Sequence, residues 1–143
     1  MDHIVYLDAS ARELDLLLDH KKTMIMRGAA GRRMPLGRVN RGDVPYFINN
    51  NAEGLVLAKS KVESVYNSDK LTEEGAAQLI DKHQGQLQLT KKQVQRWAGK
   101  RYLVLIEISG VEKVEPFRID KSNYGNIDDW LLVEQIERVR YDG

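Results

Sequence analysis

The chain has 143 residues, of which 42% are hydrophobic and 30% are charged, which is typical of a soluble globular protein with one domain over 1–143. It contains no cysteine, which excludes disulfides, thiolate catalysis and cysteine-based zinc sites. No apolar run approaches the roughly 20 residues that cross a bilayer, and the N-terminus lacks a secretory pattern, so we expect no membrane association and a cytoplasmic location.

The first predicted elements are a strand over 3–8 and a helix that follows it at once. The strand sequence, HIVYLD, is rich in residues that favour β-structure. Ser10 and Glu13 have the spacing of a capping box, which predicts a helix over 10–19. Its apolar stripe consists of leucines at helical spacing, Leu14, Leu17 and Leu18.

A strand over 22–27, a glycine- and arginine-rich loop and a strand over 43–49 come next. From Lys21 to Arg41 the sequence has seven basic residues and no acid, which leaves 15 basic against 21 acidic residues in the remainder. A nearly neutral chain has therefore concentrated positive charge on one loop. Such a concentration predicts an anionic partner, although a solvated surface loop would look similar.

The rest of the chain continues the alternation of strands and helices. A turn over 49–54 joins the preceding strand to a long strand over 55–65, and helices start at Thr72 and Thr90. The second of these, over 90–98, begins with a capping box and is followed by a nearly continuous apolar strand over 102–108. One or two short strands close the tail. Five to six mainly antiparallel strands with inserted helices indicate an α+β fold built on a small β-barrel.

Residues 20–27 resemble the signature of the ASCH domain, a branch of the PUA-like β-barrels, which reads Gly-x-Lys-x-x-Glu-x-Arg. Lys22, Thr23 and Arg27 match the pattern, and Gly42-Asp43 matches the strand start that follows it; His20 replaces the glycine and Ile25 the glutamate. The resemblance is specific over 4–66 and architectural over 100–115. It implies a PUA-like barrel with an RNA- or nucleotide-binding cleft beside the motif, and some small members of the family hydrolyse amides of modified nucleosides.

The substitution at position 25 bears on the function that the resemblance implies. Residues 25 and 27 share one face of a strand, so the family's glutamate would stand beside Arg27. With Ile25 in its place, Arg27 either pairs with a distant carboxylate or is free to bind an anion with its planar guanidinium group. We also expect Ile25 to fill the space through which a substrate would approach.

Seven basic residues are candidates for contacts with a nucleic acid or another anion: Lys22, Arg27, Arg32, Arg33, Arg38, Lys100 and Arg101. The last two are expected on the far wall of the cleft. Four further residues are candidates for its lining: His20, Thr23, Tyr46 and Asn49. Aromatic residues at strand spacing are more often core, and the basic face of the helix over 90–98 is more often solvated. The sequence has no metal-ligand spacing and no cofactor fingerprint, so we predict neither.

These observations leave three functional hypotheses. The first is a protein that binds RNA or a nucleotide in a basic cleft. The second is a small hydrolase acting on an amide of a modified nucleoside, which needs a lysine of lowered pKa beside a hydroxyl and a carboxylate. Lys22 and Thr23 could contribute to it, but Ile25 cannot transfer a proton, so we assign no catalytic residue. The third is a protein-interaction module; the ligand and the oligomeric state stay open.

Overall fold

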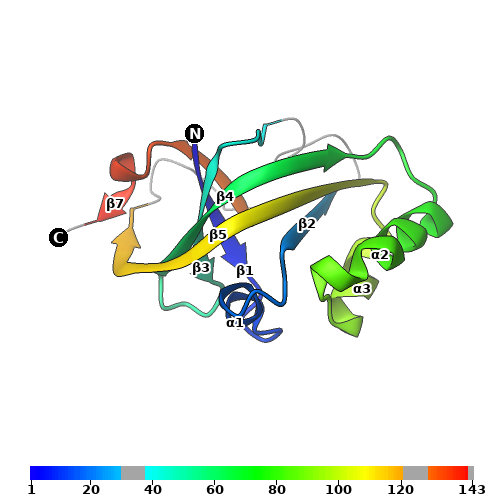
Figure 1. The fold of residues 1–143 in the computed structure, drawn as a ribbon, viewed down its shortest axis with the longest axis horizontal. Helices are drawn as coiled ribbons and strands as arrows, with labels where there is room; N and C mark the ends of the chain where they lie inside the picture. The colour runs from blue at the N-terminus through cyan, green and yellow to red at the C-terminus, as the bar shows by residue number, and fades with distance from the viewer. Residues whose placement is uncertain (30–37, 121–128, 142–143) are drawn as a thin grey trace.

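The computed structural model describes residues 1–29, 38–120 and 129–141 of the chain. Figure 1 shows the elements in chain order, which are β1 (Asp2–Leu7), α1 (Glu13–Leu18), β2 (Met24–Ala29), β3 (Val44–Asn49), β4 (Leu55–Asn67), α2 (Glu73–Leu87), α3 (Lys91–Ala98), β5 (Tyr102–Ile119), β6 (Trp130–Glu134) and β7 (Arg140–Tyr141). A short 3₁₀ helix, Ile136–Arg138, precedes β7. In this part of the chain, no helix combines the length and apolar character that a membrane crossing requires.

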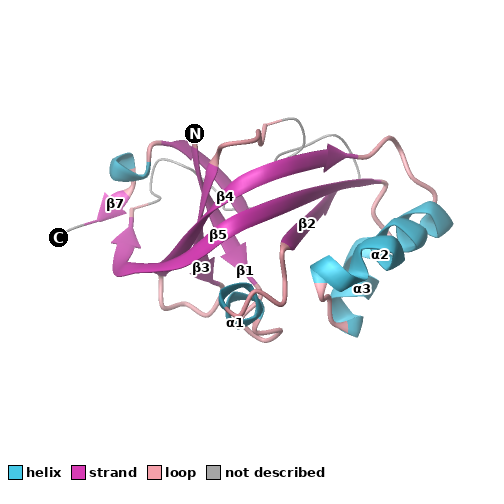
Figure 2. Cartoon of the chain, viewed as in Figure 1, coloured by secondary structure: helices cyan, strands magenta, loops and turns pink. Residues whose placement is uncertain are grey.

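The strands form one mixed sheet in the order β2-β5-β4-β3-β1-β6, with β7 paired to the far end of β5. Only β1 and β3 run parallel among the described pairs, and the others are antiparallel. The long strands β4 and β5 run side by side through the molecule, and α2 and α3 lie together at one end (Figure 2). The sheet curves into a half-barrel, which confirms the α+β barrel expected from the sequence.

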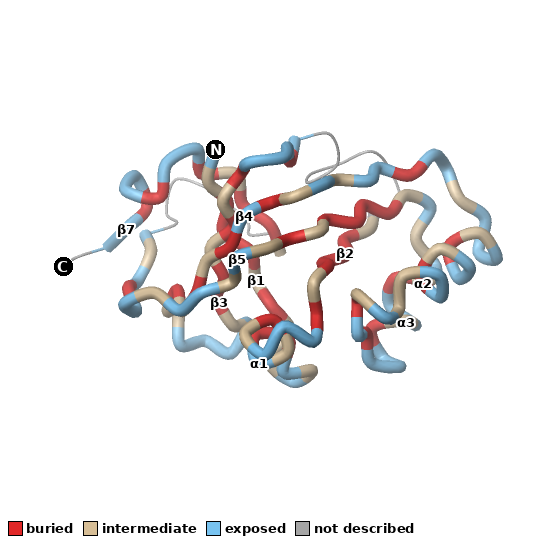
Figure 3. The backbone as a smooth tube through the Cα atoms, viewed as in Figure 1, coloured by how far each residue is buried: buried red, intermediate tan, exposed pale blue. Residues whose placement is uncertain are grey.

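The buried hydrophobic residues fall into three groups. Figure 3 marks the buried positions in red along the backbone. Ile25 packs inward with α1 and the strands of the barrel, whereas Met24 and Met26 pack against α2 and α3. This is the period of two expected for β2. A third group fills the end of the barrel near β6 and β7. The edge strand β2 is therefore covered by α2 and α3 on one face and by the barrel core on the other.

The start of α1 differs from the prediction, because Ser10 is not its cap. The helix begins at Glu13 after Arg12, whose φ is 56°, and no side chain caps it. The Ser10 hydroxyl instead donates to the Asp8 carboxylate, and the Glu13 carboxylate accepts from the backbone N–H of Asp8 at 2.9 Å. Glu13 is thus turned toward the end of β1. By contrast, the predicted caps at Thr72 and Thr90 are both present.

Two strands differ in length from their predictions. β5 extends to Ile119 and includes Gly110 at φ 62°, so the apolar strand predicted over 102–108 continues through a bend. β2 begins at Met24, two residues later than predicted. Thr23 instead donates its backbone N–H to the carbonyl of Gln86, at the end of α2. Lys22 therefore precedes the strand, so the alternation of side chains along β2 does not determine the direction of its side chain.

Candidate ligand-binding cleft

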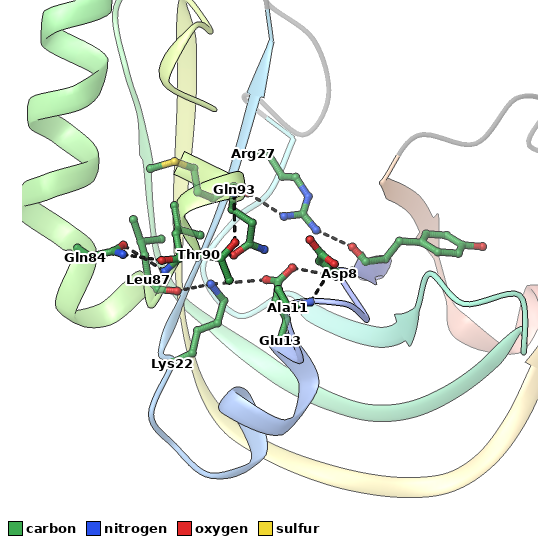
Figure 4. A network of polar contacts seen from close by, with 12 residues as sticks. Asp8, Ala11, Glu13, Lys22, Arg27, Gln84, Leu87, Thr90 and Gln93 are labelled. Carbon is green, nitrogen blue, oxygen red and sulfur yellow. Dashed lines mark hydrogen bonds and ion pairs between the residues drawn. The ribbon is translucent and has the colours of Figure 1, made fainter. Parts of the chain in front are cut away.

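A cleft lies where the ends of β1 and β3 meet β2, α1 and α3. Its lining consists of Tyr6, Asp8, Glu13, Met26, Arg27, Asn50, Leu89, Gln93, Arg96, Trp97 and Asp129. The cavity at the base of the cleft has a volume of about 20 Å³, which holds about one water molecule. Several of these side chains belong to the polar network in Figure 4, which joins the start of the chain to α2 and α3. The cleft is thus narrow and bordered by polar groups.

Arg27 forms part of the cleft wall and connects two strands. Its guanidinium group donates to the carbonyls of Met26 and Tyr6, each at 2.7 Å, so it bridges β2 and β1 where they are not paired as strands. The side chain is buried, and its Nε has no hydrogen-bond partner among the described residues. Burial lowers the pKa of Arg27, while the charges of Glu13 and Asp129 oppose that shift. Arg27 forms no ion pair with a described residue, and the hydrogen bonds of its guanidinium group go to these two backbone carbonyls.

Lys22 lies behind the cleft, in a buried ion pair. Its side chain has no exposed surface, and its Nζ lies 3.5 Å from a carboxylate oxygen of Glu13 and donates to the carbonyl of Leu87. Burial lowers the pKa of Lys22 to about 8, although Glu13 favours the charged form. A carboxylate does therefore stand beside the lysine of the motif, but it comes from α1. Lys22 joins α1 to the end of α2 and is not among the residues that line the cleft.

Ile25 is fully buried in the barrel core and does not line the cleft. The expectation that it fills the path of a substrate is therefore wrong. The physical reason is the alternation of β2, which directs position 25 into the barrel, whereas the cleft opens beside Met26 and Arg27.

The wall opposite β2 is formed by α3. The side chain of Gln93 accepts from the backbone N–H of Thr90 at 2.9 Å, which completes the predicted capping box and fixes the start of the helix. One turn further, the Arg96 guanidinium lies 4.5 Å from the centre of the Trp97 ring and 2.7 Å from the Asp129 carboxylate. The Arg96–Asp129 pair thus spans from α3 to the residue before β6, and both of its side chains are substantially exposed.

The charges on the described lining nearly balance. Arg27 and Arg96 face three acids, Asp8, Glu13 and Asp129. Burial raises the pKa of Asp8, but hydrogen bonds from Ser10 and the backbone of Ala11 outweigh this and lower it overall. The described residues therefore form a cleft with both donors and acceptors on its wall, and not a strongly basic one.

The predicted basic residues are distributed over several places. Arg27 lines the cleft and Lys22 lies behind it, whereas Arg32 and Arg33 fall outside the described residues. Arg38 is exposed and is not part of the lining. Lys100 and Arg101 line a separate hollow at the start of β5, so they do not form the far wall of this cleft. That wall is α3, whose position beside β2 no local sequence pattern specifies.

The four residues predicted to line the cleft are also absent from it. These are His20, Thr23, Tyr46 and Asn49. Tyr46 packs edge-on against Phe117, with ring centres 6.2 Å apart, as its strand spacing would favour. Asn49 lies one residue from Asn50, which does line the cleft and accepts from the backbone N–H of Ala9 at 2.9 Å. In the part of the chain that the structure describes, no group of three histidine or acidic side chains is arranged to hold a metal.

No protein-family model matches the sequence, and no curated protein matches it. Crystal structures of the ASCH protein from Zymomonas mobilis are similar to it in fold. One, of a single-residue variant, has a TM-score of 0.68 at 15% identity and covers 96% of this chain and 93% of that one. Another, of the ASCH protein itself, has a TM-score of 0.67 at 14% identity over 96% and 91% of the two chains. At this level of identity the likeness concerns the fold alone, and the chain has an ASCH-type fold.

Proposed function

We propose that this protein binds RNA or a free nucleotide and that the cleft holds one nucleotide unit. The observation that supports this is the mixture of groups on the cleft wall. The indole of Trp97 lies beside the guanidinium of Arg96, and the carboxylate of Asp8 is also in the lining. A nucleobase has a flat π surface and both donors and acceptors on its edges. A lining of balanced charge suits a base better than a chain of phosphates.

A nucleotide needs more room than about 20 Å³, so part of the wall has to move when it binds. The Arg96–Asp129 pair is suited to this, because 55% and 42% of the two side chains are exposed. An exposed ion pair of this kind contributes only about 0–1 kcal/mol. Rotation of Arg96 away from Asp129 would uncover the Trp97 ring and free the guanidinium for a phosphate group of the ligand.

The test compares variants of this ion pair with a matched control on the same helix. We expect Arg96→Gln to weaken binding of uridine monophosphate and of a labelled hexauridylate by about tenfold or more, the loss typical of one charge-assisted hydrogen bond. Asp129→Asn should instead strengthen binding, because it releases Arg96 and removes a repelling charge. Lys92→Gln removes an exposed charge from α3 outside the cleft and should bind as the parent does. Fluorescence anisotropy with the hexamer, and competition by the monophosphate, measure these affinities.

The proposal fails if Arg96→Gln and Lys92→Gln bind both ligands as the parent does. Urea denaturation of each variant establishes that a loss of binding does not reflect a loss of folded protein. An opposite sign of the effects at Arg96 and Asp129 would be difficult to obtain from a general change in surface charge alone.

A second candidate is hydrolysis of an acylated nucleoside, which the lowered pKa of Lys22 and the adjacent Glu13 carboxylate favour. A pKa of about 8 gives a substantial neutral fraction at physiological pH, and only the neutral amine is a base or nucleophile. However, Lys22 has no exposed surface and does not reach the cleft lining. We therefore expect no hydrolysis of an acylated cytidine; turnover that Lys22→Met abolishes in a folded protein would contradict this.

A further inference from the structure

A second concave surface lies where the connection from β4 to α2 meets the turn from α3 to β5, at the helical end of the molecule in Figure 1. This hollow has a volume of about 480 Å³ and is lined by Lys70, Leu71, Thr72, Glu73, Gly99, Lys100 and Arg101. The backbone N–H of Leu71 donates to the carbonyl of Arg101 at 2.7 Å, so the two segments are tied together. The hollow shares no lining residue with the cleft.

The hollow carries a net positive charge from side chains that are not paired with any described residue. Lys70, Lys100 and Arg101 face one acid, Glu73, and none of the three cations forms an ion pair with a described residue. Thr72 already caps α2 by accepting from the N–H of Gly75 at 3.0 Å. The formal positive charge of the hollow is carried by these three side chains, and one N–H of the helix start is already bonded to Thr72.

The stem of Lys100 is held in place by the neighbouring strand. A Cβ added to Gly28 would lie 2.9 Å from Cγ of Lys100, so the absence of a side chain in β2 lets the lysine pack directly on the backbone. Lys100 is half-buried as a result, while Lys70 and Arg101 are exposed. An ordered stem reduces the entropy lost when the ammonium group binds an anion.

We propose that the hollow binds backbone phosphates of a single-stranded RNA that also places one nucleotide in the cleft. This inference rests on the proposed function and adds a second contact region to it. The two regions are joined by the last turn of α3, since Trp97 lines the cleft, Gly99 lines the hollow, and the N–H of Lys100 donates to the carbonyl of Trp97 at 3.0 Å. Lysine and arginine contacts to phosphate position a nucleic acid without reading its sequence. The hollow should therefore supply the salt-dependent part of the affinity.

The main experiment removes the three cations of the hollow and compares the result with an equal loss of charge elsewhere. The hollow variant is Lys70→Gln/Lys100→Gln/Arg101→Gln; the control is Lys61→Gln/Lys82→Gln/Lys113→Gln, whose lysines are exposed and outside both sites. For hexauridylate, we expect the slope of log affinity against log salt to become shallower by up to about 0.7 for each lost phosphate contact in the hollow variant only. Affinity for uridine monophosphate should be unchanged in both variants.

A second pair of variants removes a negative charge instead, so the expected change in hexauridylate affinity has the opposite sign. Glu73→Gln removes the acid of the hollow and should strengthen hexauridylate binding severalfold. Glu74→Gln removes the same charge from the same turn of α2, but Glu74 is outside the lining and accepts a weak hydrogen bond from Gln78 at 3.4 Å. The control should therefore change the affinity less. Equal effects of the two substitutions would overturn the hollow as a specific site.

Other outcomes separate this inference from the proposed function. If the hollow and control triple variants lose hexauridylate affinity equally, the hollow is not a phosphate site, whatever Arg96→Gln does to the monophosphate. If polyglutamate of equal charge competes with hexauridylate as well as unlabelled RNA does, the surface recognises acidic polymers in general and the RNA assignment is wrong. If Arg96→Gln leaves monophosphate binding unchanged while the hollow variant alone weakens the hexamer, the hollow stands as a phosphate site but its link to an occupied cleft fails.

Discussion

The cleft and the hollow both contain cationic side chains, but they differ in how those charges are compensated. Beside the cleft, Lys22 is paired with Glu13 and Arg27 donates to two backbone carbonyls. In the hollow, the three cations have no ion-pair partner among the described residues. A buried charge requires partners within the fold, because desolvation is costly. An exposed charge has no such requirement and is available to a ligand.

This difference changes the interpretation of the sequence motif. Lys22 and Arg27 are the basic residues that match the ASCH signature, yet in this chain both hold elements of the fold together. Lys22 links α1 to the end of α2, and Arg27 links β2 to β1. Counting positive residues along the chain therefore cannot separate structural cations from cations that contact a ligand. Burial and partners make that distinction.

The largest expected effect is on stability, and it appears when the buried, paired Lys22 and the unpaired Lys100 of the hollow are each replaced by methionine. Lys22→Met removes one member of a buried ion pair. Glu13, which is only 4% exposed, would then keep a buried carboxylate without its cation. Such a change typically costs about 3–5 kcal/mol in the free energy of unfolding. Lys100→Met keeps the apolar stem over Gly28 and should change the free energy by less than about 0.5 kcal/mol.

Urea denaturation of the two variants measures this difference directly. The double variant Lys22→Met/Glu13→Gln should recover part of the loss, because it removes the buried charge left by the single substitution. Similar small losses for Lys22→Met and Lys100→Met would show that the buried pair does not stabilise the fold, and the contrast between the two regions would then have no energetic basis.

The sequence predicted most of the fold because its signals are local. The strands predicted over 22–27, 43–49 and 55–65 correspond to β2, β3 and β4, and the Thr90–Gln93 capping box located α3 within one residue. The prediction failed at Ser10, where the pattern of a cap was present but Glu13 binds the backbone of Asp8 instead. Glu13, which the local pattern assigned to the capping box, instead pairs with the buried ammonium group of Lys22, a tertiary contact.

The candidate site was less predictable because its residues come from distant parts of the chain. Glu13, Gln93 and Asp129 meet only because α3 packs beside β2 and the start of β6 lies against β1. Nothing in the local sequence specifies these two contacts. Trp97 is both part of a core cluster and part of the cleft wall, two roles that its position on the helix does not separate.

A third group of polar residues is centred on the buried histidine His3, whose two ring nitrogens are both hydrogen-bonded within the fold. His3 has no exposed surface; its Nε2 lies 2.8 Å from the Asp43 carboxylate, and its Nδ1 accepts from the indole N–H of Trp130 at 3.0 Å. Because an indole can only donate, Nδ1 carries no proton and Nε2 donates to Asp43. His3 is therefore neutral in this arrangement, and protonation would break its bond to Trp130. Burial lowers the pKa of His3 below its usual 6.5, although Asp43 opposes the shift.

The smallest predicted effect is the acid dependence that follows from this arrangement. With a lowered pKa in the folded state, the unfolded chain takes up a proton first as the pH falls through 6.5, so stability should be full above that pH and decline below it. Asp43, whose pKa is lowered from 3.8 by its hydrogen bonds in spite of burial, contributes only in more acidic solution.

His3→Gln offers an amide donor for Asp43 and an amide oxygen for Trp130 without a titrating group, so its urea midpoint should be equal at about pH 7.5 and pH 5.5. The parent's midpoint should be lower at pH 5.5; an unchanged parent midpoint, or an equal decline in the variant, would show that His3 is not the group responsible. Because His3 is buried within the fold, the substitution should leave the salt dependence of hexauridylate binding unchanged, as expected for a buried polar group that supports the structure and does not contact the ligand.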